Sequence, residues 1–151
     1  MFSPIQQTDF TELEEIISAA IRTDVAESVE EASMLVAEVA ESLKKWKTET
    51  EPSFHRKHQR DGVVTGFIIV KGYWNLSHLF VRPENQGVGI GRELVRSAIE
   101  VCRSKSPRGR IELNSSQHAV GFYTTMGFQQ AGPEHKGLGG CVPFEFVFDN
   151  G

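Results

Sequence analysis

The sequence predicts one domain of the mixed α/β class, with helices flanking a central mixed sheet. Apolar residues recur at helical spacing over the first third of the chain. Five later segments are rich in β-branched or aromatic residues, as strands are, and helical segments interrupt them in the order α–α–β–β–β–α–β–α–β. At 151 residues the chain can bury one substantial core, so we expect a single domain over residues 1–151.

Two helices are expected before Pro52, which ends this helical region. Both have the same two signals: a polar residue with Glu three positions later, which is typical of an N-terminal cap, and apolar residues spaced near 3.6. The cap pairs are Asp9 with Glu12 and Ser28 with Glu31, and the apolar positions run from Phe10 to Ile21 and from Ala32 to Trp46.

Five strands and two more helices are expected in the rest of the chain. The strands are residues 54–59, 63–70, 76–81, 110–114 and 142–148. Asp61-Gly62 predicts a hairpin turn between the first two strands. One helix follows a glycine-rich loop and continues through Cys102, and the other covers residues 118–126 and stops at Gly127.

Charge and hydropathy exclude several classes of function. The first 51 residues carry twelve acidic against four basic residues, and the remainder carries twelve basic against eight acidic. The excess of basic residues after residue 51 suits the binding of a phosphorylated small ligand. The sequence lacks the dense stripe of basic residues that is typical of a nucleic-acid-binding protein. Two solvated faces of opposite charge explain the uneven distribution equally well. No apolar run could span a membrane and no signal peptide is visible, so we expect a cytoplasmic protein that binds neither nucleic acid nor membranes.

Cys102 and Cys141 are spaced neither as a CxxC pair nor as metal ligands. We expect both to be reduced and partly buried. The sequence shows no His/Cys/Glu grouping of the kind that holds a metal, so no metal is expected.

Three glycines at alternate positions, Gly87, Gly89 and Gly91, lie between an expected strand and an expected helix. Glycines leave backbone N–H groups unshielded, and the helix N-terminus adds the positive end of its dipole. The combination predicts an anion site suited to phosphate or pyrophosphate, with Arg92 and Arg96 adding positive charge.

Three interpretations of this loop compete. A mononucleotide P-loop needs Lys and then Ser or Thr after its last glycine, and Arg92-Glu93 stand there instead, which excludes it. A dinucleotide fingerprint needs a third glycine where Arg92 stands, and should open a βαβ unit. From the loop alone, a tight strand-to-helix turn without a ligand remains open.

Two motifs carry a resemblance to a known family. The segment from Gln86 to Gly91 resembles the Q/R-x-x-G-x-G/A motif of the GNAT superfamily of acyl-CoA-dependent N-acetyltransferases. Asn114 to Phe128 resembles its second signature, N-x-x-x-x-A-x-x-F-Y-x-x-x-G-F, with Gln117 where Pro is frequent, and Gly137 to Phe146 resembles one subgroup's last strand. The match covers roughly residues 61–148. It implies the GNAT fold, in which strands of the mixed central sheet splay apart at the acetyl-CoA site.

The resemblance implies that acetyl-CoA is the co-substrate and indicates which residues bind it. Amides of the glycine loop would hold its pyrophosphate, and the strand before the loop would pair with its pantetheine arm like an added strand. Asn114 would contact the pantetheine or adenosine side. The implied residues are Leu79, Phe80, Val81, Gln86, Gly87, Val88, Gly89, Ile90, Gly91, Arg92 and Asn114. Whether the acyl group is acetyl or longer stays open.

The implied reaction is direct attack of an amine on the thioester. Tyr123 matches the family's usual acid, which protonates the departing thiolate; the alternative is a core tyrosine with a satisfied hydroxyl. Glu112 is a candidate base, because its alternation with Ile111 and Leu113 turns it to the opposite strand face, although a solvated glutamate fits equally. His78 is a further candidate base, or else a surface or cofactor-adjacent histidine.

The acceptor is expected to be a primary amine of a small molecule or peptide. In this fold, acceptor specificity is expected from residues 22–60, the Gly72-Tyr73-Trp74 turn and the Glu134-to-Gly140 loop. The acidic residues before the second helix could attract a cationic amine or simply complement the helix dipole. A catalytically silent acyl-CoA-binding module is the alternative function, a nucleotide-dependent oxidoreductase is disfavoured by the glycine spacing, and a homodimer is possible.

Overall fold

The computed structural model describes residues 1–136 and 141–149. Within them a seven-stranded sheet has the order β1-β2-β3-β4-β5-β7-β6. The strands are β1 (Phe2–Ser3), β2 (Ser53–Arg60), β3 (Val63–Lys71), β4 (Asn75–Val81), β5 (Arg110–Ser115), β6 (Gln129–Gln130) and β7 (Val142–Val147). The α-helices are α1 (Phe10–Ala20), α2 (Val29–Thr48), α3 (Ile90–Lys105) and α4 (Val120–Thr125), with short helical turns η1 (Gln7–Asp9), η2 (Ile21–Val25), η3 (Pro83–Asn85) and η4 (Gln117–Ala119).

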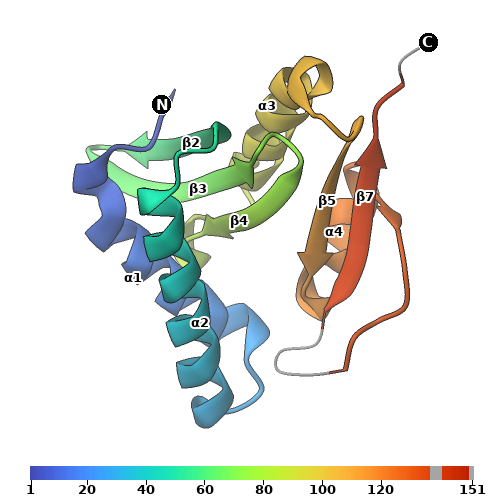
Figure 1. The fold of residues 1–151 in the computed structure, drawn as a ribbon. Helices are drawn as coiled ribbons and strands as arrows, with labels where there is room; N and C mark the ends of the chain where they lie inside the picture. Colours follow the sequence, from blue (N-terminus) through green and yellow to red (C-terminus); the bar gives the residue numbers. More distant parts are fainter. Residues whose placement is uncertain (137–140, 150–151) are drawn as a thin grey trace.

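Helices cover both faces of the sheet (Figure 1). α1 and α2 lie on one face, where a core forms around Leu13, Ile17 and Phe67. α3 and α4 lie on the other face, over a second core that includes Leu94 and Phe144. β3 lies between these two layers and is buried along almost its whole length, as expected of a continuous β-branched run.

The predicted mixed α/β class and element order are confirmed. Neighbouring strands are antiparallel except for β4 and β5, which are parallel. The Ser28 cap is present, because the amide of Glu31 donates to Ser28 Oγ at 3.1 Å. Asp61 and Gly62 both have positive φ, as a tight hairpin turn requires. β1 and β6, each of two residues, were not expected.

The predicted cap formed by Asp9 and Glu12 is wrong. α1 does begin after Asp9, but this carboxylate accepts hydrogen bonds from the Gln6 amide at 2.7 Å and from Lys57 Nζ at 2.6 Å. Glu12 instead accepts from the amide of Val64 in β3 at 2.9 Å. The local cap therefore lies one turn earlier, as a capping box between Gln6 and Asp9 at η1, and the contacts of Asp9 and Glu12 with Lys57 and Val64 fasten the start of α1 to the sheet.

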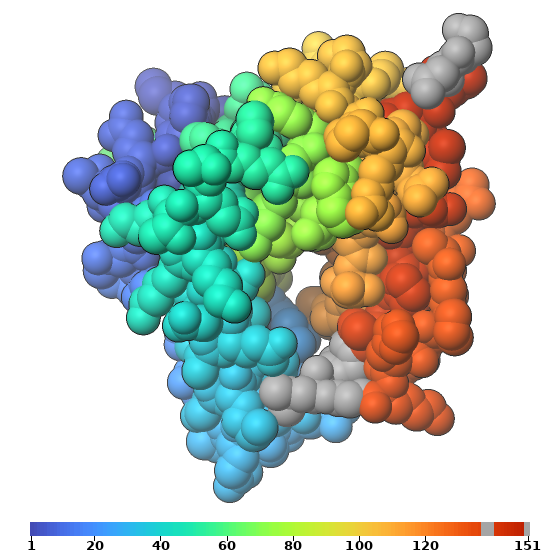
Figure 2. All heavy atoms as spheres, in the orientation of Figure 1, coloured from blue at the N-terminus to red at the C-terminus, as the bar shows by residue number. Residues whose placement is uncertain are grey.

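The sheet opens between its two parallel strands. Asn75 and Glu112 form the register pair that joins β4 to β5, and the Glu112 amide also donates to the Trp74 carbonyl at 2.7 Å. Beyond this point the strands diverge, and Figure 2 shows the molecule hollowed between α2, β4 and β5. The splay is the feature of the fold that creates room for a ligand.

Candidate active site

A cavity of about 970 Å³ fills the space between the splayed strands. Its walls come from the end of α1 with η2, the N-terminal half of α2, β4, the glycine loop, the end of β5, and α4. Segments far apart in the sequence therefore meet around one space. Both sequence motifs, at residues 86–91 and 114–128, contribute to its lining.

The glycine loop has the conformation that its residues predict. Gly87 has φ of +80° and Gly89, the N-cap of α3, has φ of +91°, a region that other residues rarely adopt. A Cβ at either position would meet no protein atom within 4 Å, so open space lies above the backbone there. Together with the free amides at the start of α3, this space forms a cradle for an anion. Arg92 lines the same cavity.

Gln86 fastens this loop to two neighbouring elements. Its Nε2 donates to the Val81 carbonyl at 3.1 Å and to Asp24 Oδ2 of η2 at 2.7 Å. The other oxygen of Asp24 lies 3.9 Å from His118 Nε2. The side chain of Gln86 therefore holds the loop in place, and Asp24 spans from the loop toward the α4 side of the cavity.

The edge of β4 that faces β5 lines the cavity through Leu79, Phe80 and Val81. Because β5 has diverged, this edge is available to another extended chain. Asn114 lines the cavity from β5 on the opposite side. The predicted contact residues of both strands are thus brought together around one gap.

Tyr123 lines the cavity from α4 and is 6% exposed. Its ring packs edge-on against Phe122 and Phe128, with centroids 5.2 and 5.5 Å apart. Its hydroxyl makes no hydrogen bond within the described part of the chain, so the alternative of a core tyrosine with a satisfied hydroxyl finds no partner there. Burial raises the pKa of Tyr123, and the phenol keeps its proton at physiological pH.

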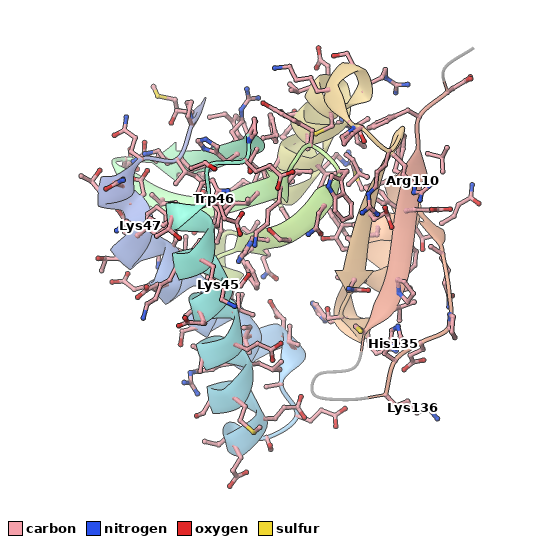
Figure 3. The ribbon with its side chains drawn as sticks, in the orientation of Figure 1. Lys45, Trp46, Lys47, Arg110, His135 and Lys136 are labelled. Atoms are coloured by element: carbon pink, nitrogen blue, oxygen red, sulfur yellow. The ribbon has the colours of Figure 1, made fainter. Side chains whose placement is uncertain are left out.

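Glu112 does not line the cavity, although it does turn away from Ile111 and Leu113 as predicted. Its Oε2 accepts a hydrogen bond from Arg108 at 2.8 Å and lies 3.4 Å from Arg110 Nε. Figure 3 shows Arg110 at one end of the half formed by β5 and β7, with His135 near the other. The alternation of side chains along a strand predicts which face of the sheet a residue lies on, but it does not predict where along that face the cavity opens.

The helical part of the predicted acceptor region does reach the cavity. Val25, Leu35 and Val39 line it with apolar side chains, next to Ile21 just before the region. The 72–74 turn does not contribute. Tyr73 lines a separate cavity of about 400 Å³, and Trp74 packs under Arg108, whose guanidinium carbon lies 3.4 Å from the ring centroid.

The third part of the predicted acceptor region, the Glu134-to-Gly140 loop, is only partly described. Residues 137–140 lie outside the described residues, and the resemblance across them cannot be followed in the structure. Glu134, His135 and Lys136 do not line the cavity, whereas Cys141 does.

Ser77 and Asp24 also line the cavity, and the site residues chosen from the sequence did not include them. Asp24 stood out only as one of several acidic residues. Ser77 had no signal, because its position depends on an irregularity in strand pairing. In residues 1–136 and 141–149, no three His, Cys, Asp or Glu side chains gather in a way that could hold a metal ion. No helix among the same residues is long and apolar enough to cross a membrane.

A splayed mixed sheet, a glycine loop at the start of a helix and a tyrosine lining the gap are the features expected of an acetyltransferase domain. The chain belongs to the acetyltransferase (GNAT) domain family, whose model matches residues 14–142. The family resemblance predicted from the two motifs is thereby confirmed.

Solved structures and curated proteins agree with this assignment. A GCN5-related N-acetyltransferase from Rhodopseudomonas palustris superposes with a TM-score of 0.84 at 17% identity, over 98% of this chain and 95% of that one. The PaiA N-acetyltransferase from Thermoplasma acidophilum, solved in complex with coenzyme A, gives 0.76 at 18% identity, over 98% of both chains. At these identities the likeness shows the fold.

Among curated proteins, the peptidyl-lysine N-acetyltransferase YjaB of Escherichia coli K12 is 36% identical over 76 residues, which is 50% of this chain and 48% of that protein. A Bacillus subtilis protein named as an alanine N-acetyltransferase of ribosomal protein bS18 is 33% identical over 79 residues, 49% of this chain and 52% of that one. The matches therefore span about half the length of these relatives.

Proposed function

We propose that residues 1–151 form one acetyltransferase domain that transfers an acetyl group from acetyl-CoA to a primary amine of a protein, peptide or small molecule. The amine attacks the thioester directly within a ternary complex. The observation that carries this proposal is that the glycine loop and Tyr123 line one cavity. Groups suited to bind the cofactor and a group suited to the chemistry thus share one space.

The residues present fit acetyl-CoA. Amides from Gly87 to Arg92, together with the open space above Gly87 and Gly89, suit a pyrophosphate. The edge of β4 at Leu79 to Val81 suits the extended pantetheine arm, whose amides can pair with a strand, and Asn114 can contact that arm from β5. Gln86 contributes by holding the loop, since its side-chain amide is already bonded to protein.

The chemistry needs a carbon–nitrogen bond to form and the carbon–sulfur bond to break. The amine loses a proton to a base, and the departing sulfur gains one from an acid. Tyr123 is the proposed acid, because it lines the cavity and its hydroxyl carries a proton at neutral pH that the departing sulfur can take up. Glu112 is the proposed base and must act through water, because its carboxylate lies outside the cavity.

That position of Glu112 is also the observation that favours the alternative function, an acyl-CoA-binding module without turnover. Two arginines stabilise the Glu112 carboxylate as a structural ion pair would. The choice between enzyme and module therefore depends on whether bound acetyl-CoA is consumed.

A thiol-release assay separates the two functions. The protein is mixed with acetyl-CoA and each of four amines: a peptide with an N-terminal alanine, a peptide containing lysine, spermidine and kanamycin. The names of the relatives motivate the two peptides. Calorimetry measures acetyl-CoA binding on the same sample. Binding with amine-dependent release supports the enzyme, binding without release supports the module, and no binding contradicts both. Intersecting double-reciprocal lines would support the ternary complex.

A further inference from the structure

Ser77 and His78 form a hydrogen-bonded pair in the β4 wall of the cavity. Ser77 Oγ and His78 Nδ1 lie 2.7 Å apart. Ser77 lines the cavity, whereas His78 is 1% exposed and lies behind the wall. The pair therefore links a hydroxyl on the cavity surface to a buried imidazole.

A β-bulge makes this contact possible. Ile69 of β3 pairs with His78, but the next residue, Val70, pairs with Leu76, so Ser77 is an extra residue in β4. In a regular strand, consecutive side chains point to opposite faces. A bulge re-aims the side chain beside it, and here the side chains of Ser77 and His78 meet.

His78 is neutral in the folded protein. The rings of Phe67 and Phe80 lie beside it, with centroids 6.3 and 6.4 Å away. Burial, helped by the charge of Lys71 and opposed by a smaller effect of the Val39 carbonyl in α2, lowers the pKa of His78 to about 4. At neutral pH one ring nitrogen therefore carries a hydrogen and the other is an acceptor.

The surroundings decide which nitrogen is the acceptor. No group within residues 1–136 and 141–149 forms a hydrogen bond with His78 Nε2, and the polar group that acts on the ring from α2 is the Val39 carbonyl. A hydrogen on Nε2 suits that carbonyl, whereas a lone pair there would oppose it. We therefore assign the tautomer in which Nδ1 is the acceptor and Ser77 donates its hydroxyl hydrogen to it.

We propose that Ser77 accepts a hydrogen bond from the amine substrate, and that His78 is a positioning residue that keeps the Ser77 oxygen available for it. The inference rests on the proposed acetyl transfer. A hydroxyl whose hydrogen is engaged offers lone pairs alone, which suit an amine N–H and repel a thioester or phosphate oxygen. Ser77 thereby helps to select an amine acceptor.

The test uses steady-state kinetics with acetyl-CoA and the amine that gives the highest turnover in the panel above. Ser77→Ala is expected to raise the KM for that amine about tenfold, as loss of one hydrogen bond does, while the acetyl-CoA dissociation constant changes less than about twofold. His78→Leu should have the same effect. His78→Asn keeps an acceptor close to the position of Nδ1 and should restore most of the amine affinity.

The double variant Ser77→Ala/His78→Leu tests whether the two residues act as one unit. Its amine KM should be no higher than that of either single variant, because the second change has nothing left to remove. Ser97→Ala provides a matched control, since Ser97 lies on the exposed side of α3 and donates to the Glu93 carbonyl at 2.9 Å. Unfolding midpoints confirm that each variant is folded.

Three results would overturn the inference alone: an unchanged amine KM in Ser77→Ala, an equal loss of acetyl-CoA affinity, or additive effects in the double variant. Absence of thiol release by the wild-type protein with every amine of the panel would overturn the proposed acetyl transfer and this inference with it. The two failures are therefore distinguishable, because the first set requires a wild-type protein that turns over.

Discussion

The amide of Glu112 donates a hydrogen bond to the carbonyl of Trp74 at 2.7 Å, at the point where β4 and β5 part. Arg108 reinforces this junction, because its guanidinium lies 3.4 Å from the Trp74 ring centroid and bonds Glu112 Oε2 at 2.8 Å. Glu112 therefore has a structural role at the closed end of the splay in addition to its proposed role as a base.

A pair of variants separates these two roles. Glu112→Gln and Arg108→Gln both break the same ion pair, but Glu112→Gln alone removes the carboxylate. If Glu112 is the base, kcat should fall about 100-fold or more in Glu112→Gln and stay near the wild-type value in Arg108→Gln. Equal small losses in both variants, matched by equal drops in unfolding temperature, would leave Glu112 a structural residue.

Tyr123→Phe is expected to reduce kcat about 100-fold without destabilising the protein. The hydroxyl makes no hydrogen bond within the described residues, so its removal breaks no contact with the protein. Thiol release and thermal unfolding measure the two effects. Tyr73→Phe is the matched control, because Tyr73 lies outside the large cavity. Unchanged turnover in Tyr123→Phe across the pH range would contradict the assignment of Tyr123 as the general acid.

Gly89→Glu should weaken acetyl-CoA binding at least about 100-fold, because a carboxylate in the cradle repels pyrophosphate. The positive φ of Gly89 also strains any side chain there, and Gly62→Glu controls for this strain. Gly62 has φ of +78°, meets no atom within 4 Å of a Cβ, and lies in the β2–β3 turn. Calorimetry should show near-native affinity for Gly62→Glu; equal affinities in the two variants would mean that the cofactor binds elsewhere.

Acid should destabilise the protein through His78. Its folded pKa of about 4 lies below the ordinary value of 6.5, so between these values the unfolded chain binds a proton that the folded chain does not. The free energy of unfolding is unaffected by this group above pH 6.5 and falls by about 3 kcal/mol by pH 4. Urea titrations of wild type and His78→Leu at pH 7.5 and pH 4.5 should show a smaller drop for the variant. Equal drops would contradict a neutral buried His78.

Much of the fold follows from local patterns. Helical spacing located α1, α2 and α3, and Asp61-Gly62 located the β2–β3 turn. β1 and β6 have two residues each, which is too short for any periodic signal, and they exist because a neighbouring strand offers an edge. Asp9 shows a similar limit, since the local pattern paired it with Glu12, whereas its carboxylate caps η1 with Gln6 and also binds Lys57, 48 positions away.

In the candidate site, too, features set by local sequence could be predicted, and features set by long-range strand pairing could not. The glycine loop and Tyr123, which the two motifs single out, both line the cavity, and the loop conformation depends on short-range geometry that the glycine spacing contains. The bulge at Ser77 arises from register with β3, and the placement of Glu112 outside the cavity arises from where the sheet opens. Both depend on long-range pairing that periodicity along one strand does not contain.

Because the splay between β4 and β5 leaves room for a ligand, the free energy of unfolding should depend on the concentration of that ligand. An extended ligand along the free edge of β4 would act as the strand missing from the ladder, and it would bind the native state alone. By mass action, such a ligand at 100 times its dissociation constant adds about 2.7 kcal/mol to stability. The protein is therefore expected to be most easily digested by proteases when the gap is empty.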